Sequence, residues 1–259
     1  MVKIHPTAIV EDGAQLADDD GLSVGAYAYV GPSVRLGRGC IVHHHGVVEG
    51  NSELGEGNEI FPFAVIGGKT QDLKHDGSDG KLTIGDGNIF REYVTVNGPT
   101  AASSETRIGN RNYLLSYVHV AHECRIHDDV IISSKAVVGG HVEICSGANI
   151  GGASAIHQFC RVGVCALLGG LSALVKDLPP YMIAEGNRAR VRTYNSVGLR
   201  RRGFSDERID MVRQIFRHIY GGRYDRSEAI DKLDKCEQIP RDLREEFVLF
   251  FRSSRRGIA

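Results

Sequence analysis

Aliphatic or aromatic residues recur at every sixth position over most of the first 180 residues. An α-helix turns by about 100° per residue, so a six-residue step would scatter these side chains over three faces. The repeat therefore predicts short strands joined by regular corners. Its longest run consists of Ile108, Leu114, Val120, Ile126, Ile132, Val138, Ile144, Ile150, Ile156, Val162, Leu168 and Leu174.

A second position, filled mostly by small residues, follows each of these apolar residues by four places. Examples are Cys40, Val118, Cys124, Ala136, Ala148, Ser154, Cys160 and Ala166. One large and one small inward side chain per side suit a narrow prism at native packing density. Gly, Asn and Asp lie between them, as in Gly55-Glu56-Gly57-Asn58, and tolerate the positive φ of a sharp corner. Hexapeptide repeats of this kind predict a parallel β-helix with three repeats in each triangular coil.

Two segments leave the six-residue period, near residues 67–81 and 97–107. Insertions between repeats in register must leave the coil as loops, and such loops often carry function. Simple surface insertions are the alternative interpretation.

The repeat ends at Asp177-Leu178-Pro179-Pro180, because two prolines cannot continue a hydrogen-bonded ladder. Ser205, followed by two acidic residues, then predicts a helix start, and Ser227 and Pro240 begin two more candidate helices. We therefore expect an all-β parallel β-helix over residues 1–180. A smaller α-helical domain over residues 181–259 would cover its C-terminal end.

Composition excludes several classes of function. The chain has 31 Lys+Arg against 32 Asp+Glu, so no global charge favours nucleic acid or an anionic membrane. No apolar run approaches the roughly 18 residues of a membrane span, and the N-terminus lacks a signal-peptide core, so we expect a cytoplasmic protein. The six cysteines contain no C-x-x-C pair and predict neither disulfides nor a metal site.

Histidines concentrate in the second half of the repeat, at His119, His122, His141 and His157. Histidine is the commonest general base near neutral pH. Because a coil spans roughly eighteen residues, His122 and His141 should lie nearly in column and border one cleft. Strand alternation would turn Glu123 away from His122 unless a corner brings it back. Each histidine taken alone could equally be structural.

Two other charged runs need an interpretation. Neighbouring strand residues point in opposite directions, so His43, His44 and His45 predict a solvated face rather than a metal site. Arg200-Arg201-Arg202 forms a local basic patch that could receive phosphates or an acidic protein, or could be a solvated connection.

These residues together resemble one family over essentially the whole chain, the acyl-carrier-protein-dependent UDP-N-acetylglucosamine O-acyltransferases, which perform the first step of lipid A synthesis. The motifs that carry the resemblance are Gln71-Asp72-Leu73-Lys74, His119-Val120-Ala121-His122-Glu123-Cys124, Gly140-His141-Val142, His157-Gln158-Phe159-Cys160, Asp177-Leu178-Pro179-Pro180-Tyr181 and Gly198-Leu199-Arg200-Arg201-Arg202-Gly203-Phe204.

The resemblance implies a left-handed parallel β-helix and a homotrimer with active sites between subunits. It implies transfer of a (3-hydroxy)acyl chain from acyl carrier protein to the 3-hydroxyl of UDP-N-acetylglucosamine, with no cofactor beyond the carrier's phosphopantetheine thioester and no metal. It assigns the general base to His122 and the oxyanion-binding N–H to Gly140. The substrate-binding positions that it implies are Gln71, Lys74, Asn97, His119, His141, His157, Gln158, Gly170, Asn195, Arg201 and Arg202.

Alternative functions stay open at this point. An enzyme of the same fold could N-acylate a UDP-amino sugar, and a metalloenzyme of the carbonic-anhydrase type could use histidines from adjacent coils. The relative that acylates a later lipid A precursor usually carries an extra N-terminal domain, whereas the hexads here begin at Ile4.

Overall fold

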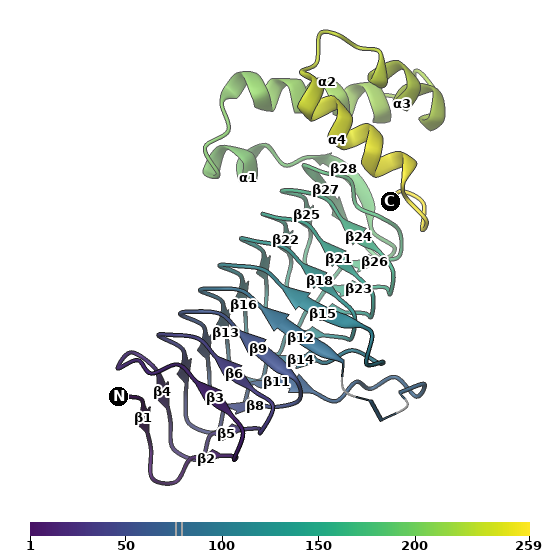
Figure 1. Ribbon diagram of the computed structural model, residues 1–259. Helices are drawn as coiled ribbons and strands as arrows, with labels where there is room; N and C mark the ends of the chain where they lie inside the picture. The colour runs from purple at the N-terminus through teal and green to yellow at the C-terminus, as the bar shows by residue number, and fades with distance from the viewer. Residues whose placement is uncertain (76, 79) are drawn as a thin grey trace.

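The computed structural model describes residues 1–75, 77–78 and 80–259. It shows a triangular prism of short parallel strands with helices packed at its C-terminal end (Figure 1). The strands within these residues form three sheets of 11, 9 and 8 strands. The predicted left-handed parallel β-helix is therefore confirmed.

Each coil contributes one strand to each sheet. Sheet 1 contains β1 (Lys3–Ile4), β4 (Ser23–Val24), β7 (Ile41–Val42), β10 (Glu59–Ile60), β13 (Ile89–Phe90), β16 (Tyr113–Leu114), β19 (Ile131–Ile132), β22 (Asn149–Ile150), β25 (Leu167–Leu168), β27 (Met182–Glu185) and β28 (Arg190–Tyr194). Sheet 2 contains β2 (Ile9–Val10), β5 (Tyr29–Val30), β8 (Val47–Val48), β11 (Val65–Gly68), β14 (Thr95–Asn97), β17 (His119–Val120), β20 (Val137–Val138), β23 (Ala155–Ile156) and β26 (Ala173–Leu174). Sheet 3 contains β3 (Gln15–Leu16), β6 (Arg35–Leu36), β9 (Ser52–Leu54), β12 (Lys81–Ile84), β15 (Glu105–Ile108), β18 (Arg125–Ile126), β21 (Glu143–Ile144) and β24 (Arg161–Val162).

The repeat's large and small apolar residues fill the inside of the prism, as predicted. Val118, Val120 and Cys124 are all fully buried. All six cysteines are free thiols, and burial raises the pKa of the Cys124 thiol to about 12. Such a thiol is a packing residue rather than a nucleophile, because the thiolate is the reactive form.

The corners differ from the prediction in one respect that matters for the site. Positive φ occurs not only at glycines but also at larger residues, including Glu123 (φ 51°), His141 (φ 59°) and Phe159 (φ 67°). These three residues occupy equivalent places in successive corners between sheets 2 and 3. A left-handed residue interrupts strand alternation, so the side chains on either side of it need not point apart.

Both predicted loops leave the prism at this same edge. The first connects β11 to β12 and the second connects β14 to β15, in each case between sheet 2 and sheet 3. The loops and the histidine-bearing corners therefore share one edge of the prism. The predicted loop near 67–81 includes positions 76 and 79, which lie outside the described residues.

The C-terminal region begins with strands rather than helices. β27 continues sheet 1 and pairs in antiparallel orientation with β28, so residues 182–194 add a hairpin to sheet 1 before the helices begin. The helices α1 (Ser196–Arg201), α2 (Asp206–Tyr220), α3 (Arg226–Asp234) and α4 (Arg241–Arg252) follow. Ser205 caps α2 as predicted, whereas Asp225 rather than Ser227 caps α3. None of the helices in the described residues is long and apolar enough to cross a membrane.

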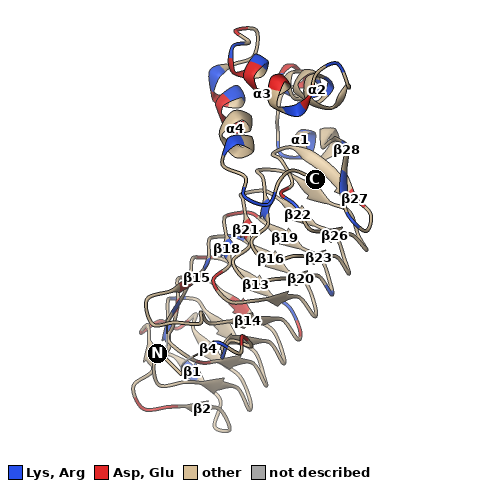
Figure 2. Ribbon diagram, turned by 90° about the vertical axis from the view of Figure 1, so that its right-hand side faces the viewer, with Lys and Arg blue, Asp and Glu red and all other residues tan. Residues whose placement is uncertain are grey.

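The outer faces of the sheets have different chemistry. Sheet 2 exposes apolar side chains such as Ile9 and Val137, which are 56% and 46% exposed. Sheet 3 instead presents charged side chains, including Arg35, Glu53 and Arg125. Figure 2 shows strands β20, β23 and β26 of sheet 2 without charged residues, in contrast to the helices above them.

Candidate active site

His122 lies at the corner that follows β17, with its side chain only 12% exposed. Its Nδ1 is hydrogen-bonded to Oε2 of Glu123, whose side chain is 9% exposed. Sequence alternation alone predicted that adjacent residues would point apart. The positive φ of Glu123 turns its carboxylate back onto the imidazole, and Thr106 Oγ1 accepts the Glu123 N–H at 2.8 Å.

The Glu123 carboxylate is held in its ionised form. Thr100, on the second loop, donates to Oε1 from its backbone N–H at 2.8 Å and from its hydroxyl at 2.5 Å. Burial opposes ionisation, but the hydrogen bonds from Thr100 and His122 outweigh it and hold the pKa of Glu123 below its usual value. An ionised carboxylate on Nδ1 selects the tautomer that is protonated there, which leaves Nε2 as a proton acceptor.

Gly140, at the corresponding corner of the next coil, lies directly against the His122 ring. A Cβ at this position would lie 2.5 Å from Cε1 and 2.6 Å from Nε2 of that ring. Only glycine therefore allows the imidazole to occupy its observed place. Within the described residues, the Gly140 N–H donates to no protein acceptor, so it can meet a ligand beside Nε2.

The first loop brings a second carboxylate to the imidazole. Asp72 Oδ2 lies 3.7 Å from His122 Nε2, and Asp72 Oδ1 accepts the Lys74 N–H at 2.8 Å. Gln71 and Lys74, both predicted to bind substrate, are exposed on this loop. Asp72 was not among the predicted site residues, although it lies between them in the sequence.

His141 is the nearest predicted partner of His122. The two ring centroids are 5.3 Å apart with perpendicular planes, which confirms that these residues stand in column. On its other side His141 stacks on Phe159, with centroids 4.6 Å apart. His157 and Gln158 are exposed at the same corner as Phe159, and Arg256 Nη2 lies 3.2 Å from His157 Nδ1.

His119 lies on β17, just before the corner that carries His122, and is partly buried. Its Nδ1 is 2.8 Å from the Thr95 hydroxyl. Burial, followed by the proximity of His122, lowers the pKa of His119 and favours its neutral form. A neutral imidazole can accept or donate a hydrogen bond beside the base without adding charge.

Among the remaining predicted residues, Asn97 ends β14, the strand that pairs with the histidine-bearing β17, whereas Asn195 lies at the start of α1, away from the histidines. The Asn97 amide donates to the carbonyls of Gly68 (3.2 Å) and Lys69 (2.7 Å), so it ties the second loop to the first. Asn195 caps α1 by accepting the Gly198 N–H at 3.0 Å. These buried contacts give both asparagines structural partners.

Gly170 and the two arginines also lie apart from His122. Gly170 is exposed at a corner between sheets 1 and 2, whereas His122 lies between sheets 2 and 3. Arg201 ends α1, and the next residue, Arg202, donates to the Asp129 carbonyl at 2.9 Å. A single chain therefore does not gather all the predicted substrate-binding residues in one place.

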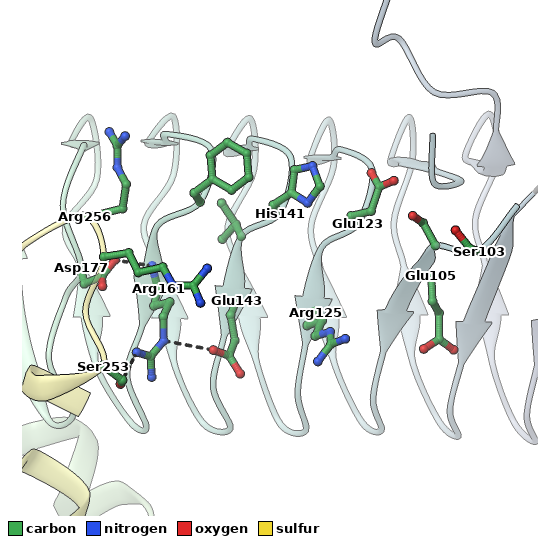
Figure 3. Close-up of a pocket in the computed structure, with 14 residues that line it drawn as sticks. Ser103, Glu105, Glu123, Arg125, His141, Glu143, Arg161, Asp177, Ser253 and Arg256 are labelled. Carbon is green, nitrogen blue, oxygen red and sulfur yellow. Dashed lines mark hydrogen bonds and ion pairs between the residues drawn. The ribbon is translucent and has the colours of Figure 1, made fainter. Parts of the chain in front are cut away.

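A groove of about 1000 Å³ runs along sheet 3 from the histidine-bearing edge to the C-terminal segment (Figure 3). Glu123 and His141 lie at one side of it, and Arg125, Arg161 and Arg256 line its length. The lining also contains Glu105, Glu143 and Asp177, and Arg161 Nε pairs with Glu143 Oε2 at 3.1 Å, so the groove has mixed charge. Its guanidinium groups suit a ligand that carries phosphate groups.

His122, Glu123 and His141 also offer three ligand atoms within 4.8 Å of one another. A metal held by Nδ1 of His122 would have to displace the hydrogen bond between His122 and Glu123. His122 Nδ1 and the Glu123 carboxylate are already hydrogen-bonded to each other. This arrangement suits a histidine–carboxylate pair better than a metal centre.

Comparison with known proteins identifies the family to which the chain belongs. The chain matches the family described as UDP N-acetylglucosamine O-acyltransferase, domain 2, over residues 177–259, and the bacterial transferase hexapeptide family over residues 105–140. It is 40% identical to the acyl-(acyl-carrier-protein)–UDP-N-acetylglucosamine O-acyltransferase of Thermodesulfovibrio yellowstonii over 260 aligned residues, which cover 100% of this chain and 99% of that one. This chain belongs to the UDP-N-acetylglucosamine O-acyltransferase family.

Solved structures of the family agree with this assignment. The UDP-N-acetylglucosamine O-acyltransferase of Moraxella catarrhalis superimposes with a TM-score of 0.92 at 35% identity, covering 98% of both chains. The UDP-N-acetylglucosamine acyltransferase of Francisella novicida gives 0.93 at 31% identity, covering 98% of this chain and 93% of that one. The predicted family, fold and acyltransferase class are confirmed.

Proposed function

We propose that the chain transfers an acyl group from acyl carrier protein to the 3-hydroxyl of UDP-N-acetylglucosamine, in lipid A biosynthesis. The observation that carries the proposal is the His122–Glu123 pair, which leaves Nε2 as the proton acceptor, beside Gly140 and 3.7 Å from the Asp72 carboxylate. Family membership supports the substrates, since the relative from Thermodesulfovibrio yellowstonii bears the name of this activity.

In the proposed mechanism, Nε2 of His122 takes the proton from the sugar 3-hydroxyl as its oxygen attacks the thioester carbonyl. Glu123 stabilises the resulting imidazolium through Nδ1–H, as carboxylates do in other histidine-based sites. The C–S bond then breaks, and the imidazolium returns its proton to the departing thiol. The products are a 3-O-acyl UDP-sugar and acyl carrier protein with a free thiol.

Gly140 would stabilise the tetrahedral intermediate between these two steps. Its N–H lies at the corner next to the His122 ring and has no acceptor among the described protein groups. A single preorganised donor to such an oxyanion contributes about 3–4 kcal/mol in comparable enzymes.

The acyl group would arrive as the phosphopantetheine thioester of acyl carrier protein, so the reaction needs no cofactor held by this chain. The arginines along the sheet 3 groove fit a substrate that carries a diphosphate. We further propose a cytoplasmic location, where both substrates would be met.

We propose that the active unit is a homotrimer. The exposed apolar residues of sheet 2, such as Ile9 and Val137, favour a covered face. A neighbouring copy would also bring its Gly170, Arg201 and Arg202 towards the edge between sheets 2 and 3, where His122 lies. These residues do not reach that edge within one chain. In such a trimer each site would use residues from two chains.

Mass spectrometry of the products tests the proposed function. Purified protein is incubated with UDP-N-acetylglucosamine and a mixed pool of acyl-acyl carrier proteins. We expect one acyl chain on the sugar, joined by an ester that mild alkali removes. An alkali-stable amide formed only with a 3-amino sugar would identify an N-acyltransferase instead, and absence of any acylated sugar would overturn the proposal.

A further inference from the structure

We propose that Thr100, on the second loop, is a positioning residue for the general base. It holds the Glu123 carboxylate against Nδ1 of His122, so that Thr100, Glu123 and His122 form a single hydrogen-bonded relay. The inference rests on the proposed function and adds a third member, from a different segment of the chain, to the histidine–carboxylate pair.

The relay uses the two carboxylate oxygens separately. Oε1 of Glu123 accepts two hydrogen bonds from Thr100, one from the backbone N–H at 2.8 Å and one from the hydroxyl at 2.5 Å. Oε2 contacts His122 Nδ1. Two donors on one oxygen fix the plane of the carboxylate, and with it the direction in which the other oxygen points.

Thr100 can act this way because its loop is anchored to the first loop. The Thr100 carbonyl lies 3.1 Å from His75 Nδ1. The Gly98 N–H donates to the Gly68 carbonyl at 2.9 Å, and the Asn97 amide donates to the same carbonyl at 3.2 Å. These contacts hold the chain just before Thr100 and at its own carbonyl, so its hydroxyl is presented from a fixed backbone.

The relay also accounts for the charge of Glu123. Burial of this carboxylate opposes ionisation, yet the donors from Thr100, together with His122, hold its pKa below the usual value. An ionised Glu123 stabilises the imidazolium that forms when His122 takes a proton. If the hydroxyl of Thr100 is removed, the pKa of Glu123 rises, and the carboxyl is protonated at a higher pH.

Three substitutions test the relay. Thr100→Val removes the hydroxyl at nearly constant volume and keeps the backbone N–H, Thr100→Ala removes it without a β-branch, and Thr100→Ser restores it. The matched control is Thr83→Val on β12, whose hydroxyl donates to Glu105 Oε1 at 2.6 Å in a part-buried pair between two strands of sheet 3. The control breaks the same kind of hydrogen bond elsewhere on the prism.

We expect Thr100→Val and Thr100→Ala to lower kcat by about 10–100-fold with KM within about twofold of wild type, because the relay acts on the transition state rather than on binding. The loss should be larger at low pH, where the raised pKa of Glu123 leaves more of it protonated. Thr100→Ser should recover most of the activity, and Thr83→Val should keep the wild-type kcat and its pH profile. A loop that only supports the fold would instead change KM or Tm without altering the pH profile.

A second readout does not depend on turnover. Proton NMR of histidine-labelled protein should show a low-field Nδ1–H resonance of His122 in wild type, Thr100→Ser and Thr83→Val, and its loss or upfield shift in Thr100→Val. Wild-type kcat and an unchanged resonance in Thr100→Val would overturn the relay, as would a Thr100→Ser variant as slow as Thr100→Val. If wild type does not acylate the UDP-sugar, the proposed function fails, while the resonance still decides whether the relay exists.

Discussion

The contact between Gly140 and the His122 ring allows no side chain at position 140. A Cβ there would lie 2.5 Å from the ring, well inside van der Waals contact. We therefore expect Gly140→Ala to displace the imidazole and lower kcat by about 100-fold or more, the range for loss of a preorganised catalytic group.

The control for this prediction is Gly98→Ala, since a Cβ at position 98 would find its nearest neighbour at 3.8 Å. Steady-state kinetics and thermal unfolding of both variants provide the measurement. Equal kcat for Gly140→Ala and wild type would contradict the placement of the ring.

The sequence predicts the place of the two histidines in this site but not the two carboxylates that approach His122. His122 and His141 were expected in column because the coil length sets their spacing, and their ring centroids are 5.3 Å apart. The sequence does not predict the contact between Glu123 and His122, because it depends on a positive φ at Glu123, which glutamate does not favour. Asp72 was missed because its approach to His122 depends on the path of a loop outside the repeat.

At the scale of elements, α4 docks onto the end of the β-helix through a part-buried polar pair. The Tyr181 hydroxyl donates to Glu246 Oε2 at 2.5 Å, and burial raises the pKa of the Glu246 carboxyl above its usual value. A carboxyl whose folded-state pKa is raised stabilises the fold below its unfolded pKa. This stability is lost as pH rises through the folded-state pKa.

We therefore expect Glu246→Gln to unfold at a higher temperature than wild type at pH 7, because glutamine needs no ionisation in that place. The difference should shrink as pH falls towards 4.5, the ordinary value of the carboxyl. Calorimetry from pH 4 to pH 8 measures it. Glu245→Gln is the control, since its neighbouring carboxylate is exposed and pairs with Arg241; equal pH dependence in both variants would contradict this account.

The elements themselves were predicted unevenly. The six-residue period predicts the coils, because each side of a coil needs one large inward side chain. Val120 and Ile126 are both buried, as expected. The strands β27 and β28 were assigned to the helical domain, because Pro179 and Pro180 interrupt the repeat just before the last coil is completed. Neither strand carries a hexad that would have revealed it.

At the scale of the whole molecule, the apolar outer face of sheet 2 and the charged face of sheet 3 predict which side meets other copies. Val137→Glu places a carboxylate at an exposed position of β20, on the outer face of sheet 2. Burying an unpaired charge costs several kcal/mol, so we expect the proposed trimer to dissociate at micromolar concentration. Analytical ultracentrifugation gives the mass.

Gln15→Glu, which adds the same charge to an exposed position of sheet 3, is the control and should leave the trimer intact. A trimer that survives Val137→Glu and dissociates with Gln15→Glu would place the interface on the opposite face.

The central claim is that His122 is the general base of an acyl transfer to UDP-N-acetylglucosamine, and single-turnover kinetics of His122→Ala test it most directly. His127→Ala is the matched control, because that histidine follows β18, is 47% exposed and pairs with Glu143. We predict that His122→Ala loses at least about 1,000-fold in the rate of acyl transfer, with Tm and assembly mass unchanged, while His127→Ala stays near wild type. A His122→Ala variant that keeps more than about a tenth of the wild-type rate would contradict the account.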